Sequence, residues 1–251
     1  MNVARAALAS VLSLALLVAA QGARPSTLAE VFVCPPCGAE CHFTTYPKTG
    51  NCGVCGMGLV PLASVPQVGV LLYPRVALPT SLLTLSLFAG SNEVRAFCVA
   101  DTTEPLRLFD TLEVRPQFAF AEAPPLDVLV VPDGFGAWDD PLLVEWVKNA
   151  AEHARFVLAV SGGSVVLARA GFLAQERVPG HGYLLRRAKE LAPELVFDET
   201  IAWRRSGKFF LARDTESALD ATLGILQELA GEESAKRTAE EFGRTWKPAA
   251  K

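Results

Sequence analysis

The sequence lacks any block of basic residues. Its 23 Lys and Arg are interspersed with 27 Asp and Glu, and the formal net charge is −4. A protein that grips a phosphate backbone normally carries a clustered basic face, so this absence argues against nucleic acid as a partner. Apolar residues make up 51% of the 251 positions. That content predicts one full-sized domain with a small appendage rather than two large cores.

The sequence has one long apolar run, residues 6–20, which follows Arg5. A retained membrane anchor is the alternative, but it needs roughly 20 apolar residues, and this run is shorter. Small residues follow at Ala20 and Gly22, where a signal peptidase would cut. No cysteine lies near the end of the run, which argues against a lipoprotein. We therefore expect residues 1–22 to be a signal peptide and the mature protein to be exported, periplasmic or extracellular.

Cysteine is scarce except in one short stretch, which holds five of the six cysteines. Four of these form two Cys-x-x-Cys pairs, and such a pair lets two thiolates of one tight turn face a single ion. Zinc takes four such ligands in a tetrahedron. The pattern predicts a zinc-ribbon-like, metal-binding knuckle over residues 23–64 with these ligands: Cys34, Cys37, Cys52 and Cys55. Gly38, Gly53 and Gly56 are expected to supply the positive φ that such turns often need.

Two alternatives remain open for this segment. An oxidising compartment permits disulfides in a segment too short to build its own core. The fifth cysteine, Cys41, or its neighbour His42 can instead replace one of the four ligands. The sixth, Cys98, stands alone in the apolar run 94–100, where a free cysteine behaves as a small hydrophobe.

The end of this segment, PKTGNCGVCGMGLVP (residues 47–61), resembles the small heavy-metal-binding domain of bacterial copper-export ATPases and periplasmic efflux adaptors. Met57 and the second cysteine pair match that family. Its usual opening, Cys-Pro-Met-His, is replaced here by Cys34-Pro35-Pro36-Cys37. Because thiolates bind both zinc and copper(I), we expect zinc, with copper or another soft metal ion as the alternative.

After residue 64 the composition changes to short apolar runs separated by amphipathic segments. The runs 68–72, 94–100, 128–131 and 156–160 are apolar throughout, as in parallel strands that are covered on both faces. One helix is predicted to start at Asp140-Pro141, an N-cap followed by proline. Another is predicted to follow Asp214 and to stop at Gly231. The pattern predicts an α/β domain over residues 65–231, followed by a charged C-terminal tail over residues 232–251, either docked or mobile.

Two motifs of this region resemble the ThiJ/PfpI superfamily, which shares a flavodoxin-like sandwich with class I glutamine amidotransferases. LDVLVVPDGFG (126–136) is similar to the strand and glycine turn before the family's active site. LAVSGGSVVLARAGFL (158–173) is similar to its nucleophile elbow and the following helix. The resemblance implies a flavodoxin-like sandwich with a mainly parallel sheet. In that register, Ser161 stands where family enzymes carry the nucleophilic cysteine, and His181 takes the place of the family's histidine.

The resemblance also implies an acidic residue soon after the first strand, yet residues 71–83 contain no Asp or Glu. Serine gains little from a helix N-terminus, since its hydroxyl is far less acidic than a thiol and needs an adjacent base. These departures favour a pseudoenzyme, a non-catalytic binding module. The alternative is a serine-dependent hydrolase, amidase or glyoxalase-like enzyme that uses Ser161 and His181. Gly134, Gly162 and Gly163 are candidates for binding a small-molecule ligand at the elbow, and a homodimer is expected from the family.

Overall fold

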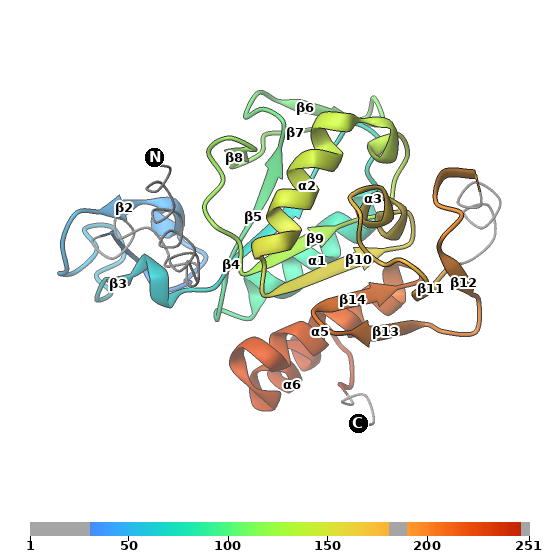
Figure 1. The fold of residues 1–251 in the computed structure, drawn as a ribbon. Helices are drawn as coiled ribbons and strands as arrows, with labels where there is room; N and C mark the ends of the chain where they lie inside the picture. Colours follow the sequence, from blue (N-terminus) through green and yellow to red (C-terminus); the bar gives the residue numbers. More distant parts are fainter. Residues whose placement is uncertain (1–30, 181–189, 247–251) are drawn as a thin grey trace, which may run out of the picture.

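The computed structural model describes residues 31–180 and 190–246, so the predicted signal peptide and His181 lie outside the described residues. Within that part of the chain, the largest sheet has seven strands in the order β13-β14-β10-β9-β4-β5-β8 (Figure 1). These strands are β4 (Gln67–Leu71), β5 (Arg95–Ala100), β8 (Phe118–Ala119), β9 (Val128–Val131), β10 (Phe156–Val160), β13 (Trp203–Ser206) and β14 (Phe209–Ala212). All neighbours pair in parallel except β13 and β14.

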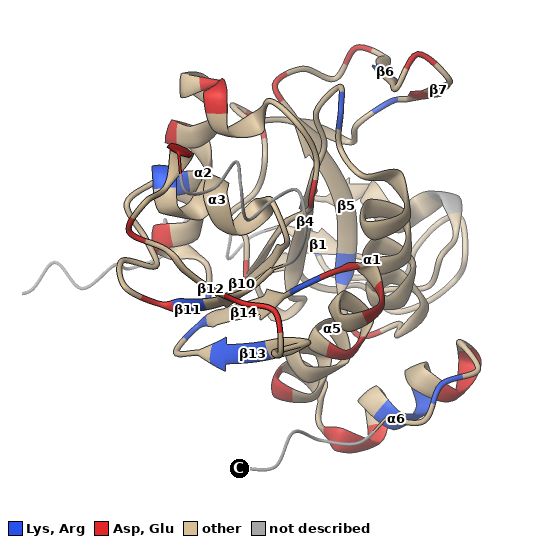
Figure 2. Ribbon diagram, turned by 90° about the vertical axis from the view of Figure 1, so that its right-hand side faces the viewer, with Lys and Arg blue, Asp and Glu red and all other residues tan. Residues whose placement is uncertain are grey.

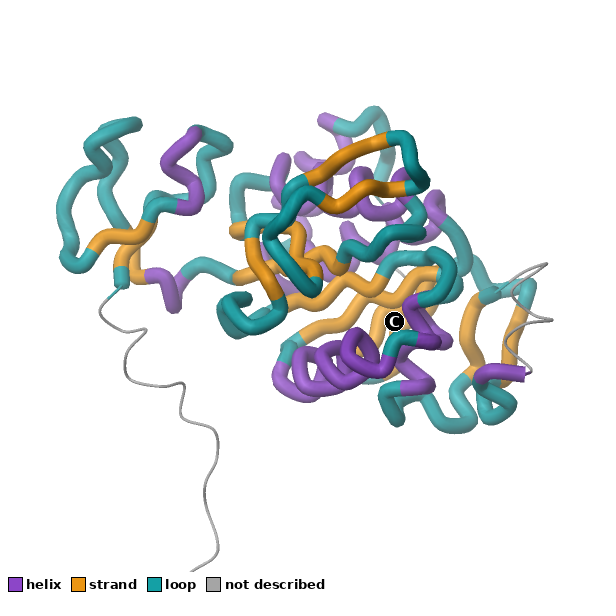
Figure 3. The backbone as a smooth tube through the Cα atoms, turned by 90° about the horizontal axis from the view of Figure 1, so that it is seen from above, coloured by secondary structure: helices purple, strands orange, loops and turns teal. Residues whose placement is uncertain are grey.

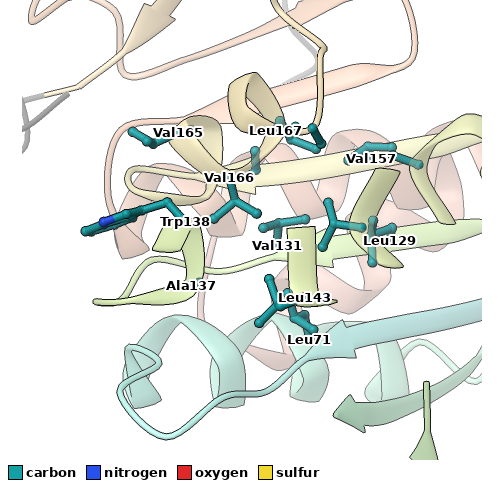
Figure 4. Packing of buried hydrophobic residues seen from close by; sticks show 14 of the residues in the cluster. Leu71, Leu129, Val131, Ala137, Trp138, Leu143, Val157, Val165, Val166 and Leu167 are labelled. Atoms are coloured by element: carbon teal, nitrogen blue, oxygen red, sulfur yellow. The ribbon is translucent and has the colours of Figure 1, made fainter. Parts of the chain in front are cut away.

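The central strands are buried on both faces, as the continuous apolar runs predicted. Along β10, Val157 and Ala159 contribute to one apolar cluster, whereas Phe156, Leu158 and Val160 contribute to the cluster on the other face. Side chains alternate between the faces of a strand, so a strand that lies between two layers must be apolar at every position. Figure 4 shows this packing around Leu129, Val131 and Val157. The predicted flavodoxin-like sandwich is confirmed.

Helices cover both faces of the sheet (Figure 1). On one face, α2 (Pro141–His153) and α3 (Gly163–Arg169) supply Leu143, Val147 and Val165 to the first cluster. On the other, α1 (Leu78–Gly90) and α5 (Thr215–Ala230) supply Phe88, Ala221 and Ile225 to the second. Among the described residues, no helix has both the length and the apolar character needed to cross a membrane.

Two helices begin at the caps that the sequence predicted. The Asp140 side chain accepts hydrogen bonds from the backbone N–H groups of Leu142 and Leu143, which have no partner inside α2. Asp214 and Ser217 form a reciprocal capping box at the start of α5. That helix ends at Gly231, whose φ of +90° halts the helical backbone.

The segment after Gly231 docks on the domain, one of the two outcomes left open by the sequence. Residues Glu232–Glu241 form α6, and Ala235 and Ala239 pack in a third cluster with Leu87 of α1 and Leu223 of α5. Figure 2 shows acidic residues at both ends of α6 and basic residues between them, and Lys236 pairs with Glu232 at 2.7 Å. Trp246 is buried, and its indole N–H donates to Gln227 Oε1 at 3.0 Å.

The cysteine-rich segment forms a separate small lobe beside the sheet (Figure 3). Its three short strands, β1 (Phe32–Val33), β2 (Thr45–Tyr46) and β3 (Val60–Pro61), form an antiparallel sheet in the order β2-β1-β3. The 3-10 helix η2 (Glu40–Phe43) precedes β2, and η3 (Leu62–Ser64) leads into β4. The other elements named within the described residues are η4 (Ala137–Asp139), the strand pair β6 (Leu106–Leu108) and β7 (Leu112–Val114), and the strand pair β11 (Arg177–Pro179) and β12 (Val196–Asp198).

Candidate functional site

Four cysteine sulfurs lie together in the small lobe. Every pair of Sγ atoms in this group is within 4.8 Å, and Cys34 Sγ lies 3.6 Å from the Sγ atoms of both Cys41 and Cys55. We call this group the sulfur cluster: Cys34, Cys41, Cys52 and Cys55. Four thiolates around a tetrahedral zinc ion at about 2.3 Å would be separated by about 3.8 Å, whereas a disulfide needs about 2.05 Å. The cluster therefore has the spacing of metal ligands.

The structure groups Cys41, the substitute that the sequence left open, with Cys34, Cys52 and Cys55, whereas Cys37 lies outside this group. Proline lacks an N–H group and restricts the residue before it to extended conformations. Pro36 would stand at position i+2 of a turn from Cys34 to Cys37, a position that type I and type II turns disfavour for proline. The chain turns later, in η2, and brings in Cys41. Cys37 is half-buried and packs against the outside of the sulfur cluster.

The second Cys-x-x-Cys pair forms the tight turn that its sequence predicts. Gly56 N–H donates to Cys52 O at 2.9 Å, and Cys52 N–H donates to Met57 O at 2.8 Å. Val54 N–H points at Cys52 Sγ, 3.4 Å away. Gly38 and Gly56 have φ of +65° and +76°, as expected, but the expectation was wrong for Gly53, whose φ is not positive.

The sulfur cluster stabilises a thiolate at Cys52. The Tyr46 hydroxyl lies 3.2 Å from Cys52 Sγ, and this hydrogen bond, together with backbone N–H donors, lowers the pKa of Cys52 to about 5. Burial has the opposite effect on the neighbours, raising the pKa of Cys41 to about 11 and the pKa of Cys34 still further. Buried sulfurs that share one negative charge form an environment suited to a cation.

The second candidate site is the elbow between β10 and α3. Ser161 has a φ of +50°, which is rare for a residue with a side chain and costs roughly 1–3 kcal/mol. The position is held by Ser161 N–H, which donates to Ala212 O at 2.8 Å, and by Ser164 N–H, which donates to Ser161 O at 3.0 Å. Only 4% of Ser161 is exposed. The chain thus keeps a strained elbow although the residue at its tip is serine.

The elbow glycines are needed for packing within the chain. A Cβ on Gly163 would lie 2.1 Å from Val131 O, and one on Gly134 would lie 2.5 Å from the Tyr73 hydroxyl. A Cβ on Gly162 would lie 2.6 Å from Asp133 Oδ1. These close approaches explain the glycines without a bound ligand, and the prediction that they bind one stays a prediction.

Asp133, which the sequence analysis missed, supplies a carboxylate beside the elbow. Its Oδ1 accepts a hydrogen bond from Gly162 N–H at 3.0 Å. Asp133 follows β9, whereas the acid expected from the resemblance would follow the first strand of the sheet. Its charge also acts on Tyr73, whose hydroxyl donates to Pro132 O at 3.0 Å. Burial first, and the Asp133 charge second, raise the pKa of Tyr73 well above its usual range.

Cys98 takes no part in either site. It lies in β5 and is 5% exposed, and burial raises the pKa of its thiol to about 11. Its role as a small apolar side chain agrees with the sequence.

A mainly parallel sheet between two helical layers defines the class of flavodoxin-like sandwiches. In this chain, the strained elbow between β10 and α3 places Ser161 at the start of a helix. Residues 78–227 match the DJ-1/PfpI family. The chain belongs to this family. It is 28% identical over 173 residues to isonitrile hydratase of Pseudomonas putida, an alignment covering 68% of this chain and 75% of that protein.

Solved structures agree with the fold. A ThiJ/PfpI family protein from Pseudomonas syringae superposes with a TM-score of 0.63 at 21% identity, covering 74% of this chain and 78% of that one. Drosophila melanogaster DJ-1beta superposes with a TM-score of 0.62 at 16% identity, covering 72% of this chain and 100% of that one. At these identities the likeness concerns the fold alone.

Proposed function

We propose that this protein is an exported DJ-1/PfpI protein that binds one thiophilic metal ion in its knuckle and uses the α/β domain for binding rather than catalysis. The observation that carries the proposal is the sulfur cluster, whose four Sγ atoms lie within 4.8 Å of one another. A cation that is bound by all four sulfurs stabilises buried thiols that contact one another. The Tyr46 hydroxyl and the Val54 N–H supply outer hydrogen bonds of the kind that orient ligands.

Zinc is the ion that this arrangement favours. Four sulfur ligands in a compact, nearly closed group suit the tetrahedral coordination of structural zinc. Copper(I) also accepts thiolates, and copper or another soft metal ion is the alternative. Three members of the cluster are nearly fully buried, which suits a structural site better than a catalytic one that must admit substrate.

A non-catalytic α/β domain is favoured by the charge beside Ser161. Catalysis at an elbow requires N–H donors that stabilise developing negative charge. Here the Gly162 N–H already donates to Asp133 Oδ1 at 3.0 Å, and the carboxylate brings a like charge toward any oxyanion formed at Ser161. A small-molecule ligand at the elbow and a homodimer remain part of the proposal.

A serine-dependent enzyme is the second candidate, favoured by the strained φ of +50° at Ser161. Such strain persists only where the surrounding structure imposes it, and it often marks a reactive position. An isonitrile hydratase among the relatives makes a hydratase, hydrolase or amidase the class to test. Labelling of Ser161 by a serine-directed phosphonate, together with turnover that disappears in both Ser161→Ala and His181→Ala, would establish this candidate instead.

Export is proposed from the apolar run at residues 6–20. The mature chain should begin close to Gln21 or Ala23. Intact mass of the protein recovered from a periplasmic extract tests this directly, and retention of Met1 would contradict it.

Elemental analysis tests the metal proposal. The mature protein, purified without chelator, is expected to carry about one equivalent of zinc, since one closed set of four thiolates binds one ion. Removing the ion should disorder residues 34–55 while the helical circular dichroism of the α/β domain changes little, because the small lobe has too few apolar residues to order itself. Alkylation and mass spectrometry that reveal two disulfides and no metal would contradict the proposal.

A further inference from the structure

The knuckle contacts the α/β domain through the residues that directly follow Cys41. Within η2, Cys41 belongs to the sulfur cluster, and the next two residues reach the sheet. The carbonyl of His42 accepts a hydrogen bond from Arg95 Nε at 3.2 Å, and the Phe43 ring lies 4.9 Å from the Arg95 guanidinium carbon. One four-residue turn therefore joins a candidate metal ligand to the surface of the neighbouring domain.

Arg95 is held in place for this contact from the side of the sheet. It is only 3% exposed, and its Nη1 donates to Gln67 Oε1 at 3.3 Å. The Gln67 side chain is itself fixed, because its Nε2 donates to Val65 O at 2.7 Å. A buried guanidinium is costly unless its donors are satisfied, and the His42 carbonyl satisfies one of them. Undocking of the knuckle would remove that acceptor.

Phe43 also completes an aromatic group at the edge of the sheet. Its ring centroid lies 6.3 Å from that of Phe97 in β5 and 6.2 Å from that of Phe118 in the edge strand β8. The rings of Phe97 and Phe118 are 4.8 Å apart, and all three pairs meet edge to face. Such aromatic pairs contribute more to the stability of the fold than their buried area alone accounts for. The knuckle thereby contributes one ring to an aromatic group at the β5–β8 end of the sheet.

We propose that metal loading of the knuckle and docking of the knuckle on the β5–β8 edge are coupled, each favouring the other. This inference rests on the proposed metal site. A 3-10 turn of four residues is too short to be stable alone, so the position of His42 and Phe43 depends on what holds Cys41. An ion that fixes Cys41 fixes the docking residues. By linkage, docking raises the affinity for the ion by the same factor.

The position of Cys41 in the sulfur cluster is essential to this coupling. Had the ion been held by Cys34, Cys37, Cys52 and Cys55, η2 would lie inside the loop between the two ligand pairs and would contain no ligand of its own. With Cys41 as ligand, a single peptide bond separates the ligand residue from His42. A displacement of Cys41 is therefore transmitted to the contact with Arg95 without an intervening flexible segment.

The coupling is tested by measuring zinc affinity in the full mature protein by competition with a chromophoric chelator. Two aromatic variants alter opposite sides of the interface, Phe43→Ala in the knuckle and Phe118→Ala in the sheet. Both leave every cysteine intact, and both are expected to weaken zinc binding by about 5- to 150-fold, the usual range of coupling between two sites. Matched controls are Thr49→Ala in the knuckle and Phe109→Ala in the α/β domain, which are both exposed and should stay within about twofold of wild type.

Hydroxyl-radical footprinting of the wild-type protein supplies the reciprocal measurement. Chelation of zinc should increase labelling of Phe43 and Phe118 and leave Phe109 unchanged. If the wild-type protein binds zinc and the zinc affinity of both aromatic variants is within about twofold of it, the coupling is refuted. The metal site is then unaffected. If zinc affinity falls in Phe43→Ala but not in Phe118→Ala, the Phe43 ring acts inside the knuckle, and this result also refutes the coupling. Wild-type protein that binds no zinc would refute the proposed function itself.

Discussion

Replacing Cys41 with serine is expected to remove the bound metal, whereas replacing Cys37 with serine leaves it in place. Cys41 Sγ lies 3.6 Å from Cys34 Sγ inside the sulfur cluster, and Cys37 lies outside that group. Loss of an outer hydrogen-bond partner alone costs about 10- to 100-fold in metal affinity, so loss of a thiolate ligand should cost about 100-fold or more. Elemental analysis after dialysis measures both variants against wild type.

The two cysteines form a matched pair for this comparison. Both lie within the same short segment, and both variants exchange one sulfur for one oxygen. Loss of metal in Cys37→Ser with retention in Cys41→Ser would restore the ligand set that the Cys-x-x-Cys pattern predicts. Loss in both would indicate a site with five sulfur participants.

Introducing cysteine at the elbow is expected to yield a reactive thiol without the activity typical of the family. In Ser161→Cys alone, the Asp133 carboxylate still accepts a hydrogen bond from the N–H of the next residue, Gly162, and a nearby like charge disfavours the thiolate. Ser161→Cys combined with Asp133→Asn keeps an oxygen acceptor for Gly162 N–H and removes the charge. Nearby charges shift a pKa by about 1–3 units, so the thiol pKa should fall by about one unit or more in the double variant. Iodoacetamide alkylation against pH, followed by mass spectrometry, measures it.

Turnover should remain poor in both variants, because positioned proton transfer contributes about 10²- to 10⁴-fold and the acid expected from the family is absent from residues 71–83. The introduced thiol should still react faster than Cys98, whose burial raises its pKa to about 11. Equal alkylation profiles in the single and double variants would mean that Asp133 does not act on the elbow. Rapid turnover of glyoxal-type or ester substrates by Ser161→Cys alone would overturn the view of a degenerate site.

The fold follows from the sequence because its signals are local and periodic. Four uninterrupted apolar runs predicted the buried parallel strands, and each appears within two residues of its expected bounds. Asp140 and Asp214 predicted helix starts because a carboxylate satisfies backbone N–H groups that the helix leaves free. Such signals depend on neighbouring residues alone and need no knowledge of the tertiary structure.

The details of both sites depend on contacts between distant segments, and there the sequence was less informative. The Cys-x-x-Cys spacing favoured Cys37, whereas the structure places Cys41 with Cys34, Cys52 and Cys55. The search for an acid followed the family's first strand, whereas Asp133 reaches the elbow from β9. The burial of Arg95 also depends on such contacts, since its guanidinium donates to the His42 carbonyl of the knuckle and to Gln67 of the neighbouring strand.

X-ray absorption at the zinc edge of the Cys37→Ser protein tests the central claim most directly. Without Cys37, a site formed by Cys34, Cys41, Cys52 and Cys55 keeps its full set of ligands. The spectrum should then fit four sulfur neighbours at about 2.3 Å. A fit to three sulfurs and one lighter atom would contradict the assignment of Cys41, and protein that holds two disulfides and no zinc would contradict the metal site altogether.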